Sequence, residues 1–257
     1  MAGHSHWHNI QQAKGKADAK RGILFTKAAQ QVILAAREGG GDPNHNLSLR
    51  IAIDYAKSVN MPKENIERAI KKGTGEDSSS QLEKVVYEGY GPLKIPFIVS
   101  AITDNKNRTV NELRNIFSKA GGELGSIGSV LWQFTESGRI TVKATKIVPS
   151  EKFGEADKEV SCDVDEVMLT LMEITNIVDI EKNEHEEGVI YVYTATNLLA
   201  QVSQAIREVG YQVIASEHHF EANTPKEVTE KERETVQNFL DTLEEHQDVQ
   251  SVWHSAR

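Results

Sequence analysis

The sequence has a single cysteine, Cys162, and no apolar run of the roughly 18 residues that a membrane-spanning helix needs. One cysteine excludes an internal disulfide framework and fits a reducing compartment. The N-terminus has neither the apolar core of a secretory signal nor the Arg- and Ser-rich amphipathic character of a transit peptide. We therefore predict a cytoplasmic protein without membrane contacts, long enough at 257 residues for about two domains.

The sequence also lacks the short motifs of common enzymes, namely Gly-x-x-x-x-Gly-Lys-Ser/Thr, Gly-x-Ser-x-Gly, His-Glu-x-x-His and Cys-x-x-Cys. The glycines at 121, 122, 125 and 128 follow a predicted helix instead of opening one. They therefore lack the N-terminal dipole of a phosphate loop and indicate a helix stop and a turn. Cys162 lies among carboxylates, which disfavour a reactive thiolate. We predict that the protein has no catalytic residues and is not an enzyme.

Histidines are the candidate metal ligands, because His4, His6 and His8 alternate near the N-terminus. No cysteine or carboxylate arrangement completes a zinc site around them. If Met1 is removed, the free amine, two backbone nitrogens and the imidazole of Ala2-Gly3-His4 can enclose Cu(II) or Ni(II) in a square plane. We interpret such binding as adventitious, and we predict no cofactor and no functional metal site.

Charge is distributed unevenly along the chain. The whole sequence has 29 Lys and Arg against 38 Asp and Glu, a net charge of −9. Residues 1–80 have 12 against 8, and residues 81–257 have 17 against 30. The basic end suggests an anionic partner, whereas the acidic remainder suggests either a protein partner or simple solubility.

The first 80 residues have helical periodicity. From Ile23 onward apolar residues recur every four positions until the glycines at 39–41 end the helix, and a second helix fits Leu47–Ser58. A third begins after Pro62 and ends at Gly73, followed by a polar linker to residue 80. On this third helix the apolar residues share one side, and three cations point away from it: Arg68, Lys71 and Lys72.

Later segments alternate between strand and helix patterns. The first group is a strand at Phe97–Ile102, a helix at Val110–Ala120, a strand at Val130–Phe134 and, after a turn at Gly138, a strand at Ile140–Val142. The second group is a helix at Val164–Ile174, strands at Asn176–Ile180 and Val189–Tyr193, a helix capped by Asn197 and a strand at Tyr211–Ala215. A capping box of Thr229 and Glu232 begins a last helix, and Val249–Trp253 ends the pattern as a strand.

These elements predict an α+β fold, with an N-terminal three-helix domain followed by two small α/β, ferredoxin-like domains. The terminal helix and strand need a sheet to join. We expect them to complete a discontinuous domain of residues 81–140 and 223–257, with residues 141–222 inserted as an acidic domain and residues 1–80 forming the helical one.

The basic helical domain is the candidate binding site, because cations on the outer faces of small helices suit a phosphate backbone and Trp7 or a histidine can stack on an unpaired base. Solvated helix faces are the plain alternative. The predicted contacts are His4, His6, Trp7, Lys14, Lys16, Lys20, Arg21, Lys27, Arg37, Lys63, Arg68, Lys71 and Lys72. A polar loop at a helix entry (Asn105, Lys106, Arg108) is a second candidate, for which a helix cap and turn is the plain alternative.

Several stretches together resemble the YebC family over essentially the whole chain. They are Met1-Ala-Gly-His-Ser-x-Trp7, Asp18-Ala-Lys-Arg-Gly22, Phe25-Thr-Lys27, Ala35-Ala-Arg-Glu-Gly-Gly-Gly-Asp-Pro43, Asn60-Met-Pro-Lys-x-Asn-Ile-Glu-Arg-Ala-Ile70, Tyr87-Glu-Gly-Tyr-Gly-Pro92, Thr103-Asp-Asn-x-Asn-Arg-Thr109 and Gly121-Gly-x-Leu-Gly-x-x-Gly-Ser-Val130. The resemblance implies three domains, a helical bundle and two α/β domains of which one is discontinuous.

For function, the resemblance implies a cytoplasmic DNA-binding transcriptional regulator or, alternatively, a ribosome-associated, rRNA-binding translation factor. An acidic protein-interaction module is a third alternative, and we expect a monomer. Where the family's arm continues with basic residues, this sequence has His6 and Gln11-Gln12-Ala13. Each lost phosphate contact lowers the slope of log K against log salt by about 0.9 for duplex DNA and about 0.7 for single strands. The departure favours structured or single-stranded RNA over a long duplex.

Overall fold

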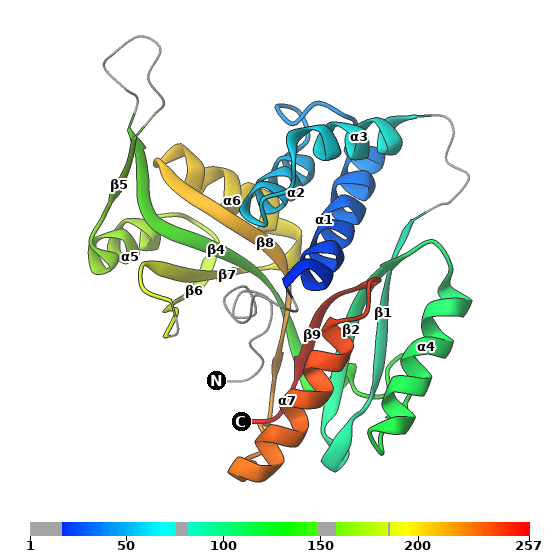
Figure 1. The fold of residues 1–257 in the computed structure, drawn as a ribbon. Coiled ribbons are helices and arrows are strands. Elements are labelled where there is room, and N and C mark those ends of the chain that lie inside the picture. The colour runs from blue at the N-terminus through cyan, green and yellow to red at the C-terminus, as the bar shows by residue number, and fades with distance from the viewer. Residues whose placement is uncertain (1–16, 76–81, 149–157, 185) are drawn as a thin grey trace. The chain divides into compact units, whose positions relative to one another are not determined.

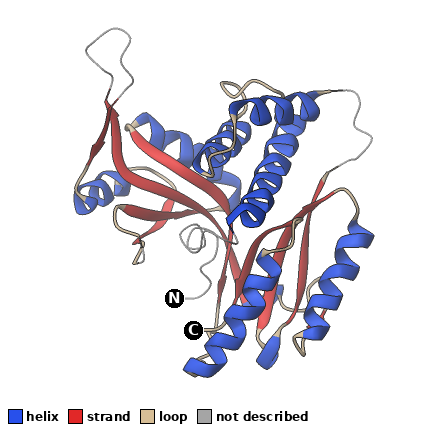
Figure 2. Cartoon of the chain, in the orientation of Figure 1, coloured by secondary structure: helices blue, strands red, loops and turns tan. Residues whose placement is uncertain are grey.

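The computed structural model describes residues 17–75, 82–148, 158–184 and 186–257 (Figure 1). The chain forms two compact units: unit 1 comprises Met1–Thr135 and Phe220–Arg257, and unit 2 comprises Glu136–His219. The described residues form three N-terminal helices, followed by strands of two sheets and the helices between those strands (Figure 2). This confirms the predicted α+β class. The exact limits of the three predicted domains stay a prediction. No helix in the described ranges is long and apolar enough to cross a membrane.

Unit 1 begins with three helices, α1 (Ala17–Gly39), α2 (Leu47–Ser58) and α3 (Lys63–Thr74). Asn46 connects the first two, because its side chain accepts from the backbone N–H of Leu49 and donates to the carbonyls of Ala35 and Gly40. The apolar stripes predicted from the sequence meet in a shared core that includes Val32, Ala36, Leu49, Ala56 and Ile66.

A glycine allows α3 to lie close against α1. A Cβ added at Gly73 would lie 2.5 Å from the carbonyl oxygen of Ile33 and 2.7 Å from the Cβ of Ala36. Any larger residue at this position would therefore push the two helices apart. Because the inner face of α3 is fixed in this way, its opposite face is held toward solvent.

The second part of unit 1 is a four-stranded antiparallel sheet in the order β3-β1-β2-β9. Its strands are β1 (Glu83–Tyr90), β2 (Pro96–Thr103), β3 (Glu123–Leu124) and β9 (Val249–His254). Helices α4 (Lys106–Lys119) and α7 (Glu230–Glu244) cover one face (Figure 1), where Phe97, Phe117 and Phe239 pack edge to face. The predicted capping box of Thr229 and Glu232 is present, and the predicted terminal strand does join this sheet.

In this part of the chain two local predictions were wrong and one strand was missed. Leu131–Gln133 forms a 3-10 turn, η3, and the strand β4 (Phe134–Val148) starts after it. The cause is the buried carboxylate of Glu88, which accepts the backbone N–H groups of Gly128, Val130 and Leu131 and so holds this segment as a loop. Gly138 makes no turn, since it pairs with Thr194 inside β4. The strand β1 was not predicted.

Unit 2 is built on a second antiparallel sheet, in which β4 continues beside β5 (Lys158–Ser161) and β7 (Val189–Thr194). β6 (Ile177–Lys182) pairs with β7, and β8 (Tyr211–Ala222) pairs with β4. Helices α5 (Val164–Met172) and α6 (Leu199–Glu208) pack on this sheet. Asn197 does not cap α6 as predicted: it lies in a 3-10 turn, η4 (Thr196–Leu198), and no side chain caps the helix.

Candidate nucleic-acid interface

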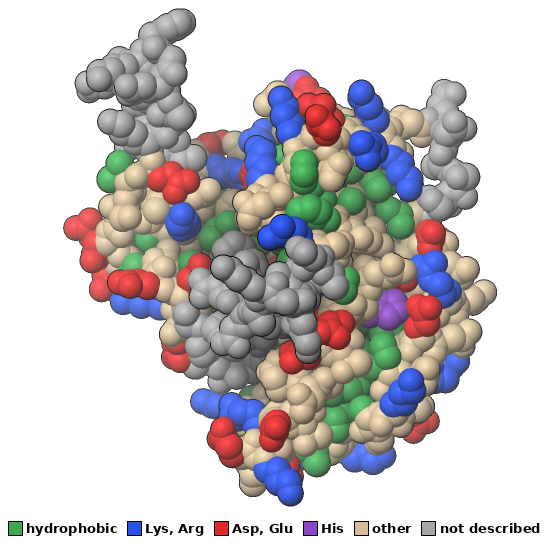
Figure 3. Space-filling view, in the orientation of Figure 1, with side chains coloured by type: hydrophobic (Ala, Val, Ile, Leu, Met, Phe, Trp, Pro, Cys, Tyr) green, Lys and Arg blue, Asp and Glu red, His purple; other side chains and the backbone are tan. Residues whose placement is uncertain are grey.

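Three cations line the outer face of α3. Arg68, Lys71 and Lys72 are spaced at i, i+3 and i+4, so they share one side of the helix, and all three are exposed. Among the described residues they form no ion pair, whereas Lys63, at the start of the same helix, lies 3.8 Å from Glu67. Figure 3 shows Lys and Arg side chains gathered over α3. We call Arg68, Lys71 and Lys72 the α3 face.

The remaining predicted contacts of the helical domain have different positions. Arg21 is exposed near the start of α1, and Lys20 belongs to the same helix. Arg37 is half-buried, and its guanidinium donates to the carbonyl of Leu82 at 3.1 Å. Five predicted contacts lie outside the described residues: His4, His6, Trp7, Lys14 and Lys16. The possible copper or nickel site at Ala2-Gly3-His4 lies outside them too.

Lys27 corrects the predicted interface. Its side chain is only 3% exposed, and its ammonium donates to the backbone carbonyl of Glu244 at 2.6 Å, at the end of α7. Burial lowers the pKa of Lys27 to about 8, although the nearby charge of Glu244 partly opposes the shift. Because this ammonium is enclosed and already bonded, it cannot contact a phosphate, and we remove Lys27 from the interface.

The second predicted site, the loop at the start of α4, has its cations neutralised. Asn105 caps the helix by accepting the backbone N–H of Arg108 at 3.0 Å. The ammonium of Lys106 lies 2.5 Å from the carboxylate of Glu83. Arg108 lies 2.8 Å from Asp248 and 3.0 Å from Asp104. The structure therefore favours the plain alternative of a helix cap with its ion pairs.

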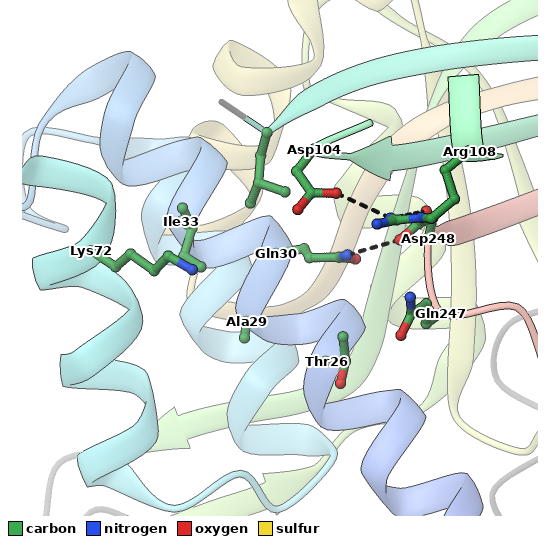
Figure 4. A pocket seen from close by; sticks show the side chains of 10 residues that line it. Thr26, Ala29, Gln30, Ile33, Lys72, Asp104, Arg108, Gln247 and Asp248 are labelled. Atoms are coloured by element: carbon green, nitrogen blue, oxygen red, sulfur yellow. Dashed lines mark hydrogen bonds and ion pairs between the residues drawn. The ribbon is translucent and has the colours of Figure 1, made fainter. Parts of the chain in front are cut away.

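Asp248 is the centre of this network (Figure 4). The carboxylate is buried, and it accepts from Arg108 at 2.8 Å and from the hydroxyl of Thr109 at 2.7 Å, while the amide of Gln30 on α1 approaches at 3.5 Å. Burial by itself would raise the pKa of Asp248, but the bonds from Arg108 and Thr109 outweigh it, so the pKa lies below its usual value. The network joins the helical bundle to the sheet of unit 1.

A pocket of about 320 Å³ lies beside this network, within unit 1 (Figure 4). Two of its charged lining residues are cations, Lys72 and Arg108, and two are anions, Asp104 and Asp248. Arg108 bonds to both anions, so the pocket offers little net charge to a ligand. We assign no ligand to it.

One cluster in the described ranges has metal-ligand chemistry, formed by Glu112, His246 and Asp248, whose ligand atoms lie within 4.8 Å of one another. Two features disfavour a cation there. The guanidinium of Arg108 contacts Asp248 and lies 4.0 Å from Glu112. The Nδ1 of His246 accepts the backbone N–H of Asp248, which leaves the proton on Nε2, facing Glu112 at 2.9 Å. This cluster is a hydrogen-bonded part of the fold.

The comparisons with known proteins agree over nearly the whole chain. The family model described as the TACO1/YebC protein N-terminal domain matches residues 5–76, and that of the TACO1/YebC second and third domain matches residues 82–256. The chain belongs to the TACO1/YebC family. This confirms the resemblance seen in the sequence motifs.

Individual TACO1/YebC relatives are similar over nearly their full length. A protein of Caldanaerobacter subterraneus named "probable transcriptional regulatory protein" is 40% identical, covering 99% of this chain and 98% of its own. One of the same name from Persephonella marina is 43% identical, covering 98% and 94%. The crystal structure of a conserved hypothetical protein from Aquifex aeolicus superposes with a TM-score of 0.79 at 37% identity, covering 98% of this chain and 97% of that one. The relatives from Caldanaerobacter subterraneus and Persephonella marina are named as regulators and not as enzymes.

Proposed function

We propose that this TACO1/YebC protein is a nucleic-acid-binding regulator of gene expression that contacts the phosphate backbone through its α3 face and its basic N-terminal arm. The observation that carries the proposal is the α3 face, three exposed cations on one side of a helix without a carboxylate partner in the described residues. Cations that no protein group neutralises are available to phosphates, whose counterions they replace. We further propose a cytoplasmic monomer without catalytic activity or cofactor.

The distribution of charge along α3 favours contact with the backbone over contact with bases. A recognition helix that reads the major groove presents its N-terminal residues to base edges. In α3 the N-terminal half carries Glu64 and Glu67, which phosphates would repel, and the cations of the α3 face follow them. Phosphate contacts position a protein on nucleic acid without reading its sequence. Sequence-independent or shape-dependent binding is therefore the expected mode.

Two nucleic acids fit this mode. The names of the relatives support DNA and transcription. The arm's Gln11-Gln12-Ala13, which supplies no cation, and the aromatic Trp7 support RNA, and with it a ribosome-associated role in translation. Sedimentation of tagged protein from lysate, with and without nuclease, separates the two. Co-migration with intact ribosomes at moderate salt supports translation, and recovery with DNA alone supports transcription.

The α3 face is tested by reversing its charges with Arg68→Glu, Lys71→Glu and Lys72→Glu together. Affinity for duplex DNA and for structured rRNA fragments is measured over a range of salt concentrations. If all three cations contact phosphates, the slope of log K against log salt falls by about 2.7 for a duplex or about 2.1 for single strands. The matched control reverses three exposed cations elsewhere, Lys119, Lys231 and Arg233, and so changes the net charge equally. Equal slopes for the two triple variants would contradict the proposal.

A further inference from the structure

One segment of unit 1 has no charge and yet exposes large apolar side chains. Residues 124–135, which run from β3 into β4, contain no charged residue, although charged residues make up 26% of the chain. Ile127 and Trp132 of this segment are 92% and 72% exposed. In the described part of the chain no other Trp, Tyr or Phe side chain is exposed. We call residues 124–135 the Trp132 segment.

The fold holds the Trp132 segment in one conformation. The buried carboxylate of Glu88 accepts three of its backbone N–H groups. The indole Nε1–H of Trp132 donates to the carbonyl of Ser129 at 3.2 Å, and Asn223 donates to the carbonyls of Trp132 and Gln133 at 3.3 and 2.9 Å. Because the only polar group of the indole is satisfied within the segment, the exposed part of the ring offers an apolar, aromatic surface.

Packing does not explain the exposed tryptophan. The residues of the segment that enter the core are Val130 and Phe134, whereas Trp132 belongs to no core cluster of the described residues. A buried carboxylate is costly unless it is bonded, and here the bonds of Glu88 hold a segment whose largest side chain faces solvent. A tryptophan held rigidly at the surface is typical of a contact site, because Trp is enriched among the residues that dominate binding.

Hydrogen bonds connect the Trp132 segment to two other stretches of unit 1. The side chain of Gln133 donates to the hydroxyl of Tyr90, at the end of β1, at 3.0 Å. Three positions after Asn223, which is bonded to the segment, the ammonium of Lys226 donates to the carbonyl of Leu93 at 2.6 Å. Residues 89–98, 124–135 and 222–226 are therefore in mutual contact.

The three stretches together are cationic. They contain two lysines, Lys94 and Lys226, and no Asp or Glu. Both lysines are exposed, and neither forms an ion pair among the described residues. Sites for single-stranded nucleic acid combine an aromatic ring that stacks on a base with cations for the backbone. A protein contact would need only the apolar ring, so the two lysines and the absence of carboxylates favour nucleic acid.

We propose that Trp132 stacks on an unpaired base of the bound nucleic acid, and that Lys94 and Lys226 contact the phosphates beside that base. The inference rests on the proposed nucleic-acid binding and adds a base contact to the phosphate contacts of the α3 face. A base inside a duplex keeps both its faces stacked on neighbouring pairs, so this site selects single-stranded or looped nucleic acid.

The stacking is tested with the full-length protein and a fluorescent oligouridine, with binding measured by anisotropy. Trp132→Leu and Trp132→Phe both lose the indole bond to Ser129, but only the second keeps an aromatic ring. Trp132→Leu is expected to weaken binding about tenfold, and Trp132→Phe to stay within about threefold of the wild type. Neither changes the slope of log K against log salt, because no phosphate contact is lost. Affinity for an RNA duplex should not change.

The phosphate contacts are tested with Lys94→Gln and Lys226→Gln together. The slope for oligouridine should fall by about 1.4, since each lost contact lowers it by about 0.7. The matched control, Lys119→Gln with Lys231→Gln, removes two exposed lysines elsewhere and should leave the slope unchanged. Equal slopes for the two pairs overturn this part of the proposal.

The remaining outcomes separate this inference from the proposed function. Wild-type affinity in Trp132→Leu, or an equal loss in the Leu and Phe variants, overturns the stacking. Binding of duplexes but not of oligouridine by the wild type overturns the stacking alone. If the wild type binds neither, the proposed function fails and the stacking fails with it. If reversing the α3 face has no more effect than its control while Trp132→Leu still weakens binding, only the role of the α3 face is wrong.

Discussion

The α3 face and the start of α4 carry the same kinds of residue and use them differently. Arg68, Lys71 and Lys72 are exposed and make no ion pair among the described residues. Lys106 and Arg108 are held by Glu83, Asp104 and Asp248. The decisive partner, Asp248, lies 140 positions from Arg108 in the sequence. A cation is therefore available to nucleic acid only where the tertiary structure brings no carboxylate to it, and counting charges along a chain cannot show this.

The largest expected effect comes from removing that partner. Asp248→Ala leaves the guanidinium of Arg108 and the hydroxyl of Thr109 without their acceptor at a buried position. We expect a loss of about 3 kcal/mol in the free energy of unfolding, at the low end for a broken buried pair because Arg108 keeps some access to water. Urea denaturation of the purified variant measures it.

Asp104→Ala is the matched control for this prediction. It removes the exposed carboxylate that the same guanidinium contacts at 3.0 Å. An exposed pair contributes about 0–1 kcal/mol, so the control should lose far less than Asp248→Ala. Similar losses in the two variants would show that Asp248 does not hold the network together.

An effect on stability that develops only as the pH rises is expected from Lys27, the cation that the fold buries. Its pKa is about 8 in the folded protein and about 10.5 when unfolded. Between these values the unfolded chain binds more protons than the folded one, so stability should rise as the pH increases from about 8 to about 10.5. The total gain is at most about 3 kcal/mol.

Lys27→Met isolates this contribution, because other groups titrate in the same range. The difference in unfolding free energy between the wild type and the variant should change with pH from 8 to 10. At neutral pH the variant lacks the hydrogen bond to the Glu244 carbonyl, which lowers its stability. It also no longer buries a charge, which raises its stability. A difference that stays constant over this range would mean that Lys27 titrates normally.

The sequence predicted the elements whose signals are local. α2 was predicted at its exact limits, and the capping box of Thr229 and Glu232 formed as expected. In both cases the residues that cap or stop the helix lie within a few positions of it. The terminal strand was expected to join the sheet of residues 81–140, because it had no neighbouring strand in the sequence, and it does so as β9.

The errors came from residues whose partners are distant. The periodicity of α1 identified the stripe that faces α2 and α3, but Lys27, Gln30 and Gln31 form a second, polar contact with the end of α7 and with β9. The apolar run at 130–134 looked like a strand because nothing nearby showed that Glu88 would bind its backbone N–H groups.

The smallest effects on stability are expected from neutralising one cation in each of the two sites, Lys106 at the start of α4 and Arg68 on the α3 face. Lys106→Gln removes an exposed ion pair with Glu83, so we expect a loss of about 0.5 kcal/mol at low salt, which should shrink as salt is added. Arg68→Gln removes a cation of the α3 face, and a surface change of this kind stays within about 0.5 kcal/mol in either direction. For nucleic-acid affinity we expect the larger loss from Arg68→Gln, because Lys106 is paired with Glu83 whereas Arg68 has no carboxylate partner in the described residues. If Lys106→Gln weakened nucleic-acid binding as much as Arg68→Gln did, neutralisation by carboxylates would not be what distinguishes the two sites.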